Sequence, residues 1–444
     1  MSKIKVVKFG GSSLADAAQF QKVARIILAE PERRYVVPSA PGKRFKEDRK
    51  VTDMLYACYD AVQGGADFDA SFAPVRERFD SIVRDLNLSV DLEDSYAQIR
   101  VMFSKPDERD FAASRGEYLN GLLLAAYLGF PFVDAAGIIF FDKFGKLDEA
   151  RTYASLKEMA ARFPKAVIPG FYGTIRDADG RKHIKTFSRG GSDITGSIVA
   201  RGVSADLYEN WTDVSGFFVA DPRLVTNPRV IDTISFNELR ELSYMGATVL
   251  HEDSVFPVRA VGIPINIRNT NEPDAPGTRI VRAEDAPIHS GRVTGVAGKR
   301  GFCVITMEKD MMNSEVGFTR RVLSVLERHG ISYEHLPTGI DTLGIVLHED
   351  ILKGREELLL QEIQEAGQPD HIEVVHNIAL IAVVGRGMVR SKGIAARLLS
   401  AIAGADINIR MIDQGSSEMN IIIGVDQNDF ERAVRAVYVE FFVY

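Results

Sequence analysis

The N-terminal segment contains the arrangement that most restricts the fold: a buried strand, a glycine turn, an amphipathic helix and a second strand. Residues 4–9 (IKVVKF) predict the first strand, which Gly10 and Gly11 end. Between residues 20 and 28 the apolar positions recur at the spacing of one helix face, and residues 35–37 predict a second strand. Strands that alternate with helices in this way are typical of a parallel sheet, so the segment predicts an α/β fold.

The C-terminal part of the chain has a repeated pattern. Residues 269–278 (NTNEPDAPGT) combine two prolines, a glycine and polar residues, which favours a linker. Beyond it, the order strand, helix, strand, strand is predicted twice, with a period of about 76 residues. The predicted elements are 302–307, 315–329, 331–336 and 342–347, then 379–384, 392–404, 407–412 and 419–425. Two βαββαβ modules of the ferredoxin-like type fit this order.

Length, composition and charge exclude several classes of protein. The 444 residues, of which 45% are hydrophobic and 26% charged, are enough for two to four soluble domains. A net charge of -7 disfavours a general nucleic-acid or membrane-surface binder. Two cysteines, Cys58 and Cys303, cannot form a disulfide framework. No apolar run of about 20 residues occurs, so we expect no membrane span and a cytoplasmic location.

The first strand leads into a candidate phosphate site. Lys8 is followed by Phe9, Gly10 and Gly11 at a predicted helix start. Glycines let backbone N–H groups approach a phosphate closely, and a helix N-terminus favours anions. A lysine one turn away adds a point charge for a transferring phosphoryl group. The alternative is a tight turn with a surface lysine, since no Walker A sequence occurs.

Two further loops have a similar character. Residues 188–193 (SRGGSD) again lead into a predicted helix, so the domain has a second candidate anion site in which Arg189 could clamp a carboxylate. Residues 211–216 (WTDVSG) and 220–223 (ADPR) combine a strand end with a carboxylate and an arginine, which suits a nucleotide. A capped loop and a surface ion pair are the alternatives.

The remaining candidates are weaker. Residues 114–117 (SRGE) place a carboxylate beside a glycine before a predicted helix, with a helix cap as the alternative. The eight histidines show no metal-ligand spacing, and we assign no metal ligand from side chains. Residues 43–50 (KRFKEDRK) predict a solvated loop.

Taken together, these segments resemble the monofunctional aspartokinases, members of the amino-acid kinase superfamily with two C-terminal ACT domains. The resemblance covers nearly the whole chain. It rests on KFGGSS (8–13), PSAPG (38–42), VTDML (51–55), SRGE (114–117), GFYG (170–173), FSRGGSD (187–193), WTDVSG with ADPR (211–223), RNTNEPDAPGT (268–278), VVGRGM (383–388) and INIRMIDQGSSEMN (407–420).

The resemblance implies a three-layer α/β/α kinase domain over residues 1–290. Two ACT domains would follow, over 291–370 and 371–444, and they could interlock. Lys8 and Asp193 would be catalytic. The residues implied for ATP are Lys8, Phe9, Gly10, Gly11, Thr212, Asp213, Phe218, Arg223 and Thr248. Those implied for the amino-acid substrate are Ser39, Thr52, Glu117, Arg189, Gly190, Gly191 and Ser192, with Glu117 on its ammonium and Arg189 on its α-carboxylate.

The sequence departs from the family at three places. Thr248 stands where the family usually has a lysine that helps to bind ATP, and Phe218 stands for a tyrosine. The charged segment 43–50 lengthens a loop and could supply the missing charge.

The expected reaction is phosphoryl transfer from ATP, with Mg²⁺, to the β-carboxylate of L-aspartate, the first step towards lysine, threonine and methionine. A carboxylate is already ionised at neutral pH, so no general base is needed. The alternatives are a catalytically impaired amino-acid sensor and a related kinase that acts on glutamate.

The resemblance also implies an amino-acid effector at the seam between ACT modules, and a homodimer or homotetramer formed through them. Glu334 would lie where a cationic side chain ends, which favours lysine, although a solvated strand residue is the alternative. The residues expected at the effector site are Met312, Glu315, Gly317, Phe318, Ser332, Tyr333, Glu334 and Thr338.

Overall fold

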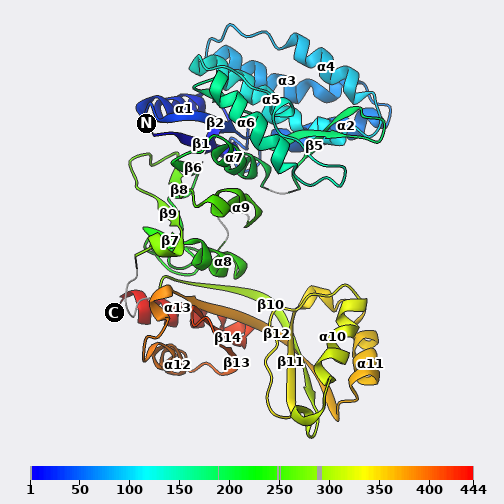
Figure 1. The fold of residues 1–444 in the computed structure, drawn as a ribbon, viewed down its shortest axis with the longest axis vertical. Coiled ribbons are helices and arrows are strands. Elements are labelled where there is room, and N and C mark those ends of the chain that lie inside the picture. Colours follow the sequence, from blue (N-terminus) through cyan, green and yellow to red (C-terminus); the bar gives the residue numbers. More distant parts are fainter. Residues whose placement is uncertain (1–2, 189, 248–249, 251, 288–292, 444) are drawn as a thin grey trace. The chain divides into compact units, whose positions relative to one another are not determined.

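The computed structural model describes residues 3–188, 190–247, 250, 252–287 and 293–443. It divides into two compact units (Figure 1). The first comprises residues 1–217, 230–236 and 249–286, and the second comprises 218–229, 237–248 and 287–444. No helix among the described residues is long and apolar enough to cross a membrane.

The first unit is built on a seven-stranded sheet in the order β3-β2-β1-β6-β8-β9-β7. All neighbouring strands are parallel except the pair β8 and β9, which confirms the predicted mainly parallel sheet. The strands are β1 (Lys5–Phe9), β2 (Arg33–Pro38), β3 (Ala166–Val167), β6 (Leu207–Thr212), β7 (Thr233–Ser235), β8 (Ile265–Asn269) and β9 (Thr278–Val281).

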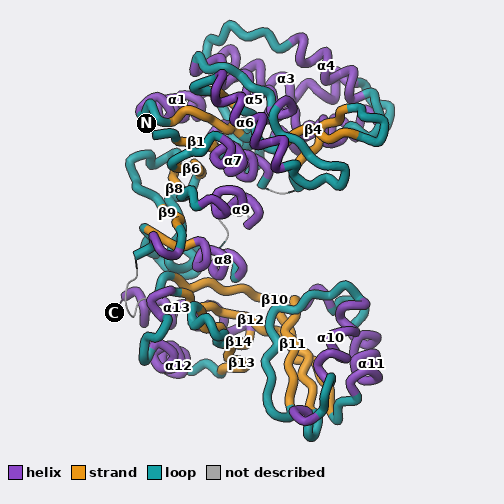
Figure 2. The backbone as a smooth tube through the Cα atoms, in the orientation of Figure 1, coloured by secondary structure: helices purple, strands orange, loops and turns teal. Residues whose placement is uncertain are grey.

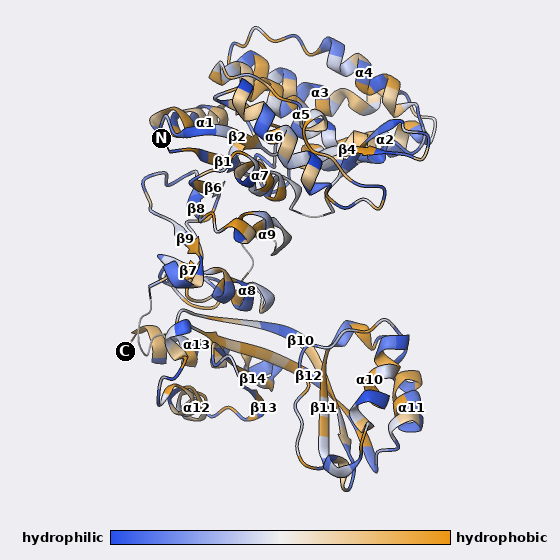
Figure 3. Ribbon diagram, viewed as in Figure 1, coloured by the Kyte–Doolittle hydropathy of each residue, from blue (hydrophilic) through white to orange (hydrophobic). Residues whose placement is uncertain are grey.

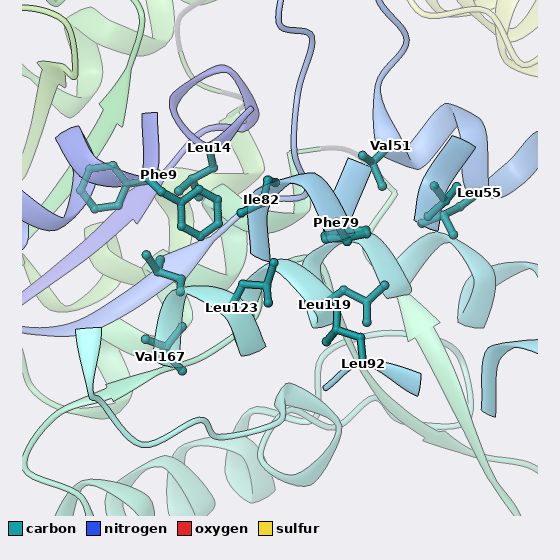
Figure 4. Close-up of a cluster of buried hydrophobic side chains, with 14 of the residues drawn as sticks. Phe9, Leu14, Val51, Leu55, Phe79, Ile82, Leu92, Leu119, Leu123 and Val167 are labelled. Carbon is teal, nitrogen blue, oxygen red and sulfur yellow. The ribbon is translucent and has the colours of Figure 1, made fainter. Parts of the chain in front are cut away.

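Helices cover both faces of this sheet. The helices are α1 (Ala17–Ala29), α2 (Val51–Gln63), α3 (Phe68–Asp85), α4 (Glu93–Phe103), α5 (Arg109–Leu128), α6 (Glu149–Arg162), α7 (Gly191–Gly202) and α9 (Glu252–Val261), and a hairpin is formed by β4 (Tyr172–Arg176) and β5 (Lys182–Thr186). Side chains alternate along a strand, so Val7 and Phe9 of β1 join one hydrophobic core with residues of α1 to α5 (Figure 4). Helix α7 packs on β1, β2 and β6. The Lys8 side chain lies on the opposite face of β1 from Val7 and Phe9, and it reaches Asp193 of α7.

The second unit contains a five-stranded antiparallel sheet in the order β11-β10-β12-β14-β13. The strands are β10 (Gly295–Glu308), β11 (Thr342–His348), β12 (His371–Val384), β13 (Ile409–Asp413) and β14 (Asn420–Asp426). The helices are α8 (Phe236–Tyr244), α10 (Phe318–Arg328), α11 (Glu356–Gly367), α12 (Ile394–Gly404) and α13 (Phe430–Tyr438), shown in purple in Figure 2.

The two repeats share their longest strands. The first half of β10 (295–299) pairs with the second half of β12 (380–384), which in turn pairs with β14. The second half of β10 (302–308) pairs with β11 and with the start of β12. Each repeat therefore receives a strand segment from the other. Each also has its own hydrophobic core, and the apolar end of β12 is visible in orange in Figure 3. The boundaries 291–370 and 371–444 stay a prediction.

One expected linker and one expected strand were wrong. Residues 269–278 are not a linker between domains, because they join β8 to β9 inside the first unit. The predicted strand 331–336 is not a regular strand. This part of the chain makes only isolated bridges, between His335 and Val346 and between Thr338 and Leu343.

Candidate active site

Lys8 is held in place by an ion pair beneath the start of α7. Its Nζ lies 2.6 Å from Asp193 Oδ1, and its side chain is buried, with 8% exposed. The same carboxylate oxygen accepts a hydrogen bond of 2.6 Å from Asn210 Nδ2 on β6. Three neighbouring elements thus fix one cation at the carboxyl ends of parallel strands, where open α/β sheets place their ligands. Asn210 was not predicted, and its position two residues before the strand end was the only signal.

The loops after β1 and β2 pack backbone against backbone. Gly10 N–H donates to the Trp211 carbonyl at 3.0 Å, and Gly42 N–H donates to the Gly11 carbonyl at 2.8 Å. A Cβ at Gly11 would lie 2.8 Å from the Ala40 carbonyl oxygen. Gly11 therefore lets the loop after β1 approach the loop after β2 closely, and Phe9 beside it is buried in the core.

Gly42 tests this packing directly. A Cβ there would lie 2.6 Å from the Gly11 carbonyl carbon, so the backbone of one loop must shift. We expect Gly42→Ala to lower the free energy of unfolding by about 1–3 kcal/mol and to reduce activity. Urea denaturation and the ATP dependence of the rate measure both effects. Gly137→Ala is a matched control, because its Cβ would meet nothing within 4 Å. A Gly42→Ala enzyme that matched this control in both measurements would contradict the assigned packing.

The segment 43–50 is largely exposed, as predicted, but Asp48 anchors it. Asp48 pairs with Arg44 at 2.9 Å and with the buried Arg78 at 2.7 Å, and the Arg44 hydrogen bond contributes most to lowering the Asp48 pKa. Arg78 also donates to the Gly42 carbonyl at 2.9 Å. The charged segment is therefore tied to the glycine loop.

Helix α7 begins at a crowded turn. Gly190 has a left-handed backbone (φ 56), and a Cβ at Gly191 would lie 2.3 Å from the Phe171 ring. Phe171 itself has a φ of 80, which is strained for a residue with a side chain. Ser192 is buried. Arg189 and Thr248 lie outside the described residues, so their predicted roles stay predictions.

Glu117 is a buried carboxylate with one unsatisfied oxygen. It lies in the middle of α5, so the expectation that SRGE precedes a helix was wrong. Burial raises its pKa to about 8, against the opposing effect of a hydrogen bond from the Ala40 backbone N–H. Its Oε2 has no hydrogen-bond partner in the described chain. Nearby, Ser39 and Thr52 are half-buried, on the loop after β2 and at the start of α2.

The third predicted loop is split between the two units. In the first unit, Thr212 ends β6 and its hydroxyl donates to Asp213 at 3.2 Å. Phe218 and Arg223 belong to the second unit, where Arg223 is 83% exposed and pairs with Asp221 at 2.6 Å. Their predicted role in ATP binding stays a prediction.

The predicted effector residues all lie in the second unit. Met312 and Phe318 are buried, and Gly317 has a left-handed backbone (φ 86) at the N-terminus of α10. Glu315 forms ion pairs with Lys309 and Arg321. Ser332 and Tyr333 are exposed.

Two further predicted effector residues have specific surroundings. The Glu334 carboxylate accepts a hydrogen bond from the Tyr244 hydroxyl on α8. Thr338 lines a cavity of about 370 Å³ together with Arg410 of β13.

Comparisons with known proteins decide the family. Residues 3–269 match the model of the amino acid kinase family, and residues 381–441 match an ACT domain. Aspartokinase 3 of Bacillus subtilis is 40% identical, with 99% of both chains covered. The chain belongs to the aspartokinase family.

Solved structures of relatives agree with this assignment. The aspartate kinase of Clostridium acetobutylicum is 52% identical, with a TM-score of 0.92, over 99% of this chain and 100% of that chain. Escherichia coli aspartokinase III was solved with aspartate and ADP (25% identity, TM-score 0.75) and with lysine and aspartate (27%, 0.74), each over 99% of this chain and 100% of that chain. The family explains both the parallel kinase sheet and the antiparallel C-terminal sheet.

Proposed function

We propose that the protein transfers the γ-phosphoryl group of ATP to the β-carboxylate of L-aspartate. The observation that carries the proposal is the buried Lys8, which Asp193 fixes at the start of α7, two residues before the glycine turn at Gly10 and Gly11. The E. coli relative, whose structure holds aspartate and ADP, supports aspartate and an adenine nucleotide as the ligands.

The chain's residues contribute position and charge rather than acid–base chemistry. Lys8 neutralises charge on the transferring phosphoryl group, and the backbone N–H groups that follow Gly10, whose own N–H is bonded to Trp211, hold the phosphates. Asp193 orients Lys8, because it is already engaged by the Lys8 ammonium and by Asn210. No side chain needs to remove a proton, since the attacking carboxylate is ionised at neutral pH.

We expect Mg²⁺ to bind together with the nucleotide rather than at a site made of protein side chains. Among the described residues, no group of three or more His, Cys, Asp or Glu side chains lies close enough together to hold a metal ion. We assign Mg²⁺ to the phosphate oxygens, where it would neutralise charge. Asp193 and Asp213 are the carboxylates at the ends of the loops that would face it.

The amino-acid substrate would be held by charge at both ends. Glu117 would receive the α-ammonium, and Arg189 would receive the α-carboxylate, with Ser39, Thr52 and Ser192 lining the same pocket.

The carboxyl-phosphate product is reactive, so a following enzyme that reduces or displaces this acyl phosphate must consume it.

An assay of ADP release distinguishes the substrates. We expect turnover with ATP, Mg²⁺ and L-aspartate, and little with L-glutamate or N-acetylglutamate. Turnover with glutamate at equal or greater kcat/KM, or none with any of them, would reject the proposal.

We also propose feedback inhibition by lysine at the second unit. The E. coli relative was solved with lysine, and the acidic Glu334 would attract the cationic end of this effector. Glu334 already accepts a hydrogen bond from Tyr244 of α8, so an ammonium group that binds Glu334 competes with this contact. The effector would therefore break the hydrogen bond that ties Tyr244 of α8 to Glu334.

Inhibition curves test this assignment. At subsaturating aspartate we expect lysine to inhibit, and Glu334→Ala to weaken that inhibition by about 5–150-fold. Tyr244→Phe is the matched variant: it removes the competing hydroxyl and should strengthen lysine inhibition. Inhibition by threonine alone, or lysine inhibition unchanged in Glu334→Ala, would contradict the assignment.

The homodimer or homotetramer stays a prediction, and sedimentation with and without lysine would measure the oligomeric state.

A further inference from the structure

Two buried side-chain oxygen atoms on α5 have no hydrogen-bond partner among the described residues. They are Glu117 Oε2 and Asn120 Oδ1. Glu117 is 6% exposed and Asn120 is 0% exposed. Residues three positions apart in a helix lie on the same face, so the two side chains are neighbours. Glu117 was predicted to bind substrate, whereas Asn120 was not singled out.

The orientation of the Asn120 side chain is set by the loop after β2. Its Nδ2 donates to the Ser39 carbonyl at 2.6 Å, which only the NH₂ end of the amide can do. The amide oxygen must therefore point away from Ser39. Glu117 is held by the next residue of the same loop, through the Ala40 backbone N–H. Each of the two side chains thus makes one hydrogen bond to the loop after β2 and keeps one oxygen atom, Glu117 Oε2 or Asn120 Oδ1, without a partner.

Buried polar atoms without a hydrogen-bond partner raise the free energy of the folded protein, so such a pair needs an explanation. A primary ammonium is the group that fits it. It carries three N–H donors and a positive charge, so one carboxylate and one neutral oxygen can both accept from it. A second carboxylate at position 120 would instead place two like charges together in a buried site.

We propose that Asn120 is a specificity-determining residue whose Oδ1 accepts a hydrogen bond from the α-ammonium of the amino-acid substrate, beside Glu117. This inference rests on the proposed function and deepens it. It identifies a second contact, beside that of Glu117, that separates an amino acid from a dicarboxylate without an amine, such as succinate.

The test measures binding of three ligands by calorimetry in wild type and Asn120→Leu, whose side chain has the same number and branching of heavy atoms. Aspartate is titrated in the presence of ADP so that no turnover occurs. ADP alone and succinate with ADP are titrated separately. We expect the Kd of aspartate to rise about ten- to hundredfold, the range for an ion-assisted hydrogen bond. The Kd values of ADP and succinate should change by less than about twofold.

A purely structural role gives a different pattern. If Asn120 only holds the loop that runs from Ser39 to Gly42, the affinities for ADP and aspartate should fall together, and that result would overturn the inference. An aspartate Kd within twofold of wild type would overturn it as well. Asn266→Leu is the matched control, because Asn266 on β8 also has a buried Oδ1 without a partner. This control should leave all three affinities unchanged.

The inference can fail without the proposed function. If wild type releases ADP with aspartate while Asn120→Leu binds aspartate normally, only the role of Asn120 is wrong. If wild type releases no ADP with aspartate, the proposed function is wrong.

Discussion

Lys8→Ala should lower kcat by about 100–1000-fold while the Kd of aspartate stays within a few-fold of wild type. Its ammonium is buried and fixed at 2.6 Å from Asp193, so no surface lysine can replace it. A fixed charge in a buried site acts most strongly on charge that develops during the reaction, and removing one such group typically costs this factor. Single-turnover kinetics and aspartate titration measure the two quantities.

The matched control for Lys8→Ala is Lys22→Ala. Lys22 lies on α1 of the same unit, and its Nζ bonds Asn271 at the surface. It should retain normal kcat. If the Lys8→Ala enzyme kept more than a tenth of wild-type kcat, the role given to Lys8 would be wrong.

Glu117→Gln should raise the KM of aspartate by about ten- to hundredfold, with far less effect on the KM of ATP. The neutral amide loses the charge that attracts the substrate ammonium. In wild type, burial raises the Glu117 pKa to about 8, so the free enzyme holds this group protonated at neutral pH. Ammonium binding requires the ionised form. Aspartate binding should therefore release a proton below about pH 8, and kcat/KM should fall as the pH drops.

The same pKa predicts an effect on stability with a definite sign. The ordinary value of 4.5 applies to the unfolded chain, so between about pH 4.5 and pH 8 the unfolded state loses this proton while the folded state keeps it. The free energy of unfolding contributed by Glu117 should therefore fall as pH rises through this window and level off above about 8.

Ligand-free Glu117→Gln should be more stable than wild type at pH 9, by a margin that shrinks towards pH 5. Thermal unfolding from pH 5 to 9 measures this difference. Glu158→Gln, at an exposed position of α6, is the control that should show no such trend. Equal effects of Glu117→Gln on the KM of ATP and aspartate, or a parallel stability profile, would show that Glu117 is a structural residue.

The parallel sheet was predictable because its signals are local. An apolar run, a glycine pair and a helix-spaced apolar face follow one another within residues 4–37, and strand β1, helix α1 and strand β2 form there. The repeat in the second unit was predictable for the same reason. The family resemblance allowed the two repeats to interlock, but the particular sharing of β10 and β12 was not predictable, because nothing local in residues 295–308 shows that one strand pairs with two different partners along its length.

The candidate site residues, too, were predictable where their signal is local and not where it depends on distant contacts. Lys8 and the glycines stand in a recognisable motif. Asn210 and Asn120 stand in none, because their roles arise from contacts across many residues: Asn210 reaches Asp193, and Asn120 reaches Ser39. The position of Glu117 was misjudged because Gly116 suggested a helix start, whereas the structure uses this glycine to bring α5 against Ala40. A Cβ there would lie 2.7 Å from Ala40 Cβ.

Trapping the product tests most directly whether the enzyme phosphorylates the β-carboxylate of aspartate. The enzyme is incubated with ATP, Mg²⁺ and L-aspartate in the presence of hydroxylamine, which converts an acyl phosphate into a stable hydroxamate, and the product is identified by mass spectrometry and NMR. We expect L-aspartate β-hydroxamate in proportion to the ADP formed, and about 100–1000-fold slower formation with the Lys8→Ala enzyme. ADP formation without hydroxamate, or a hydroxamate at the α-carboxyl group, would contradict phosphorylation of the β-carboxylate.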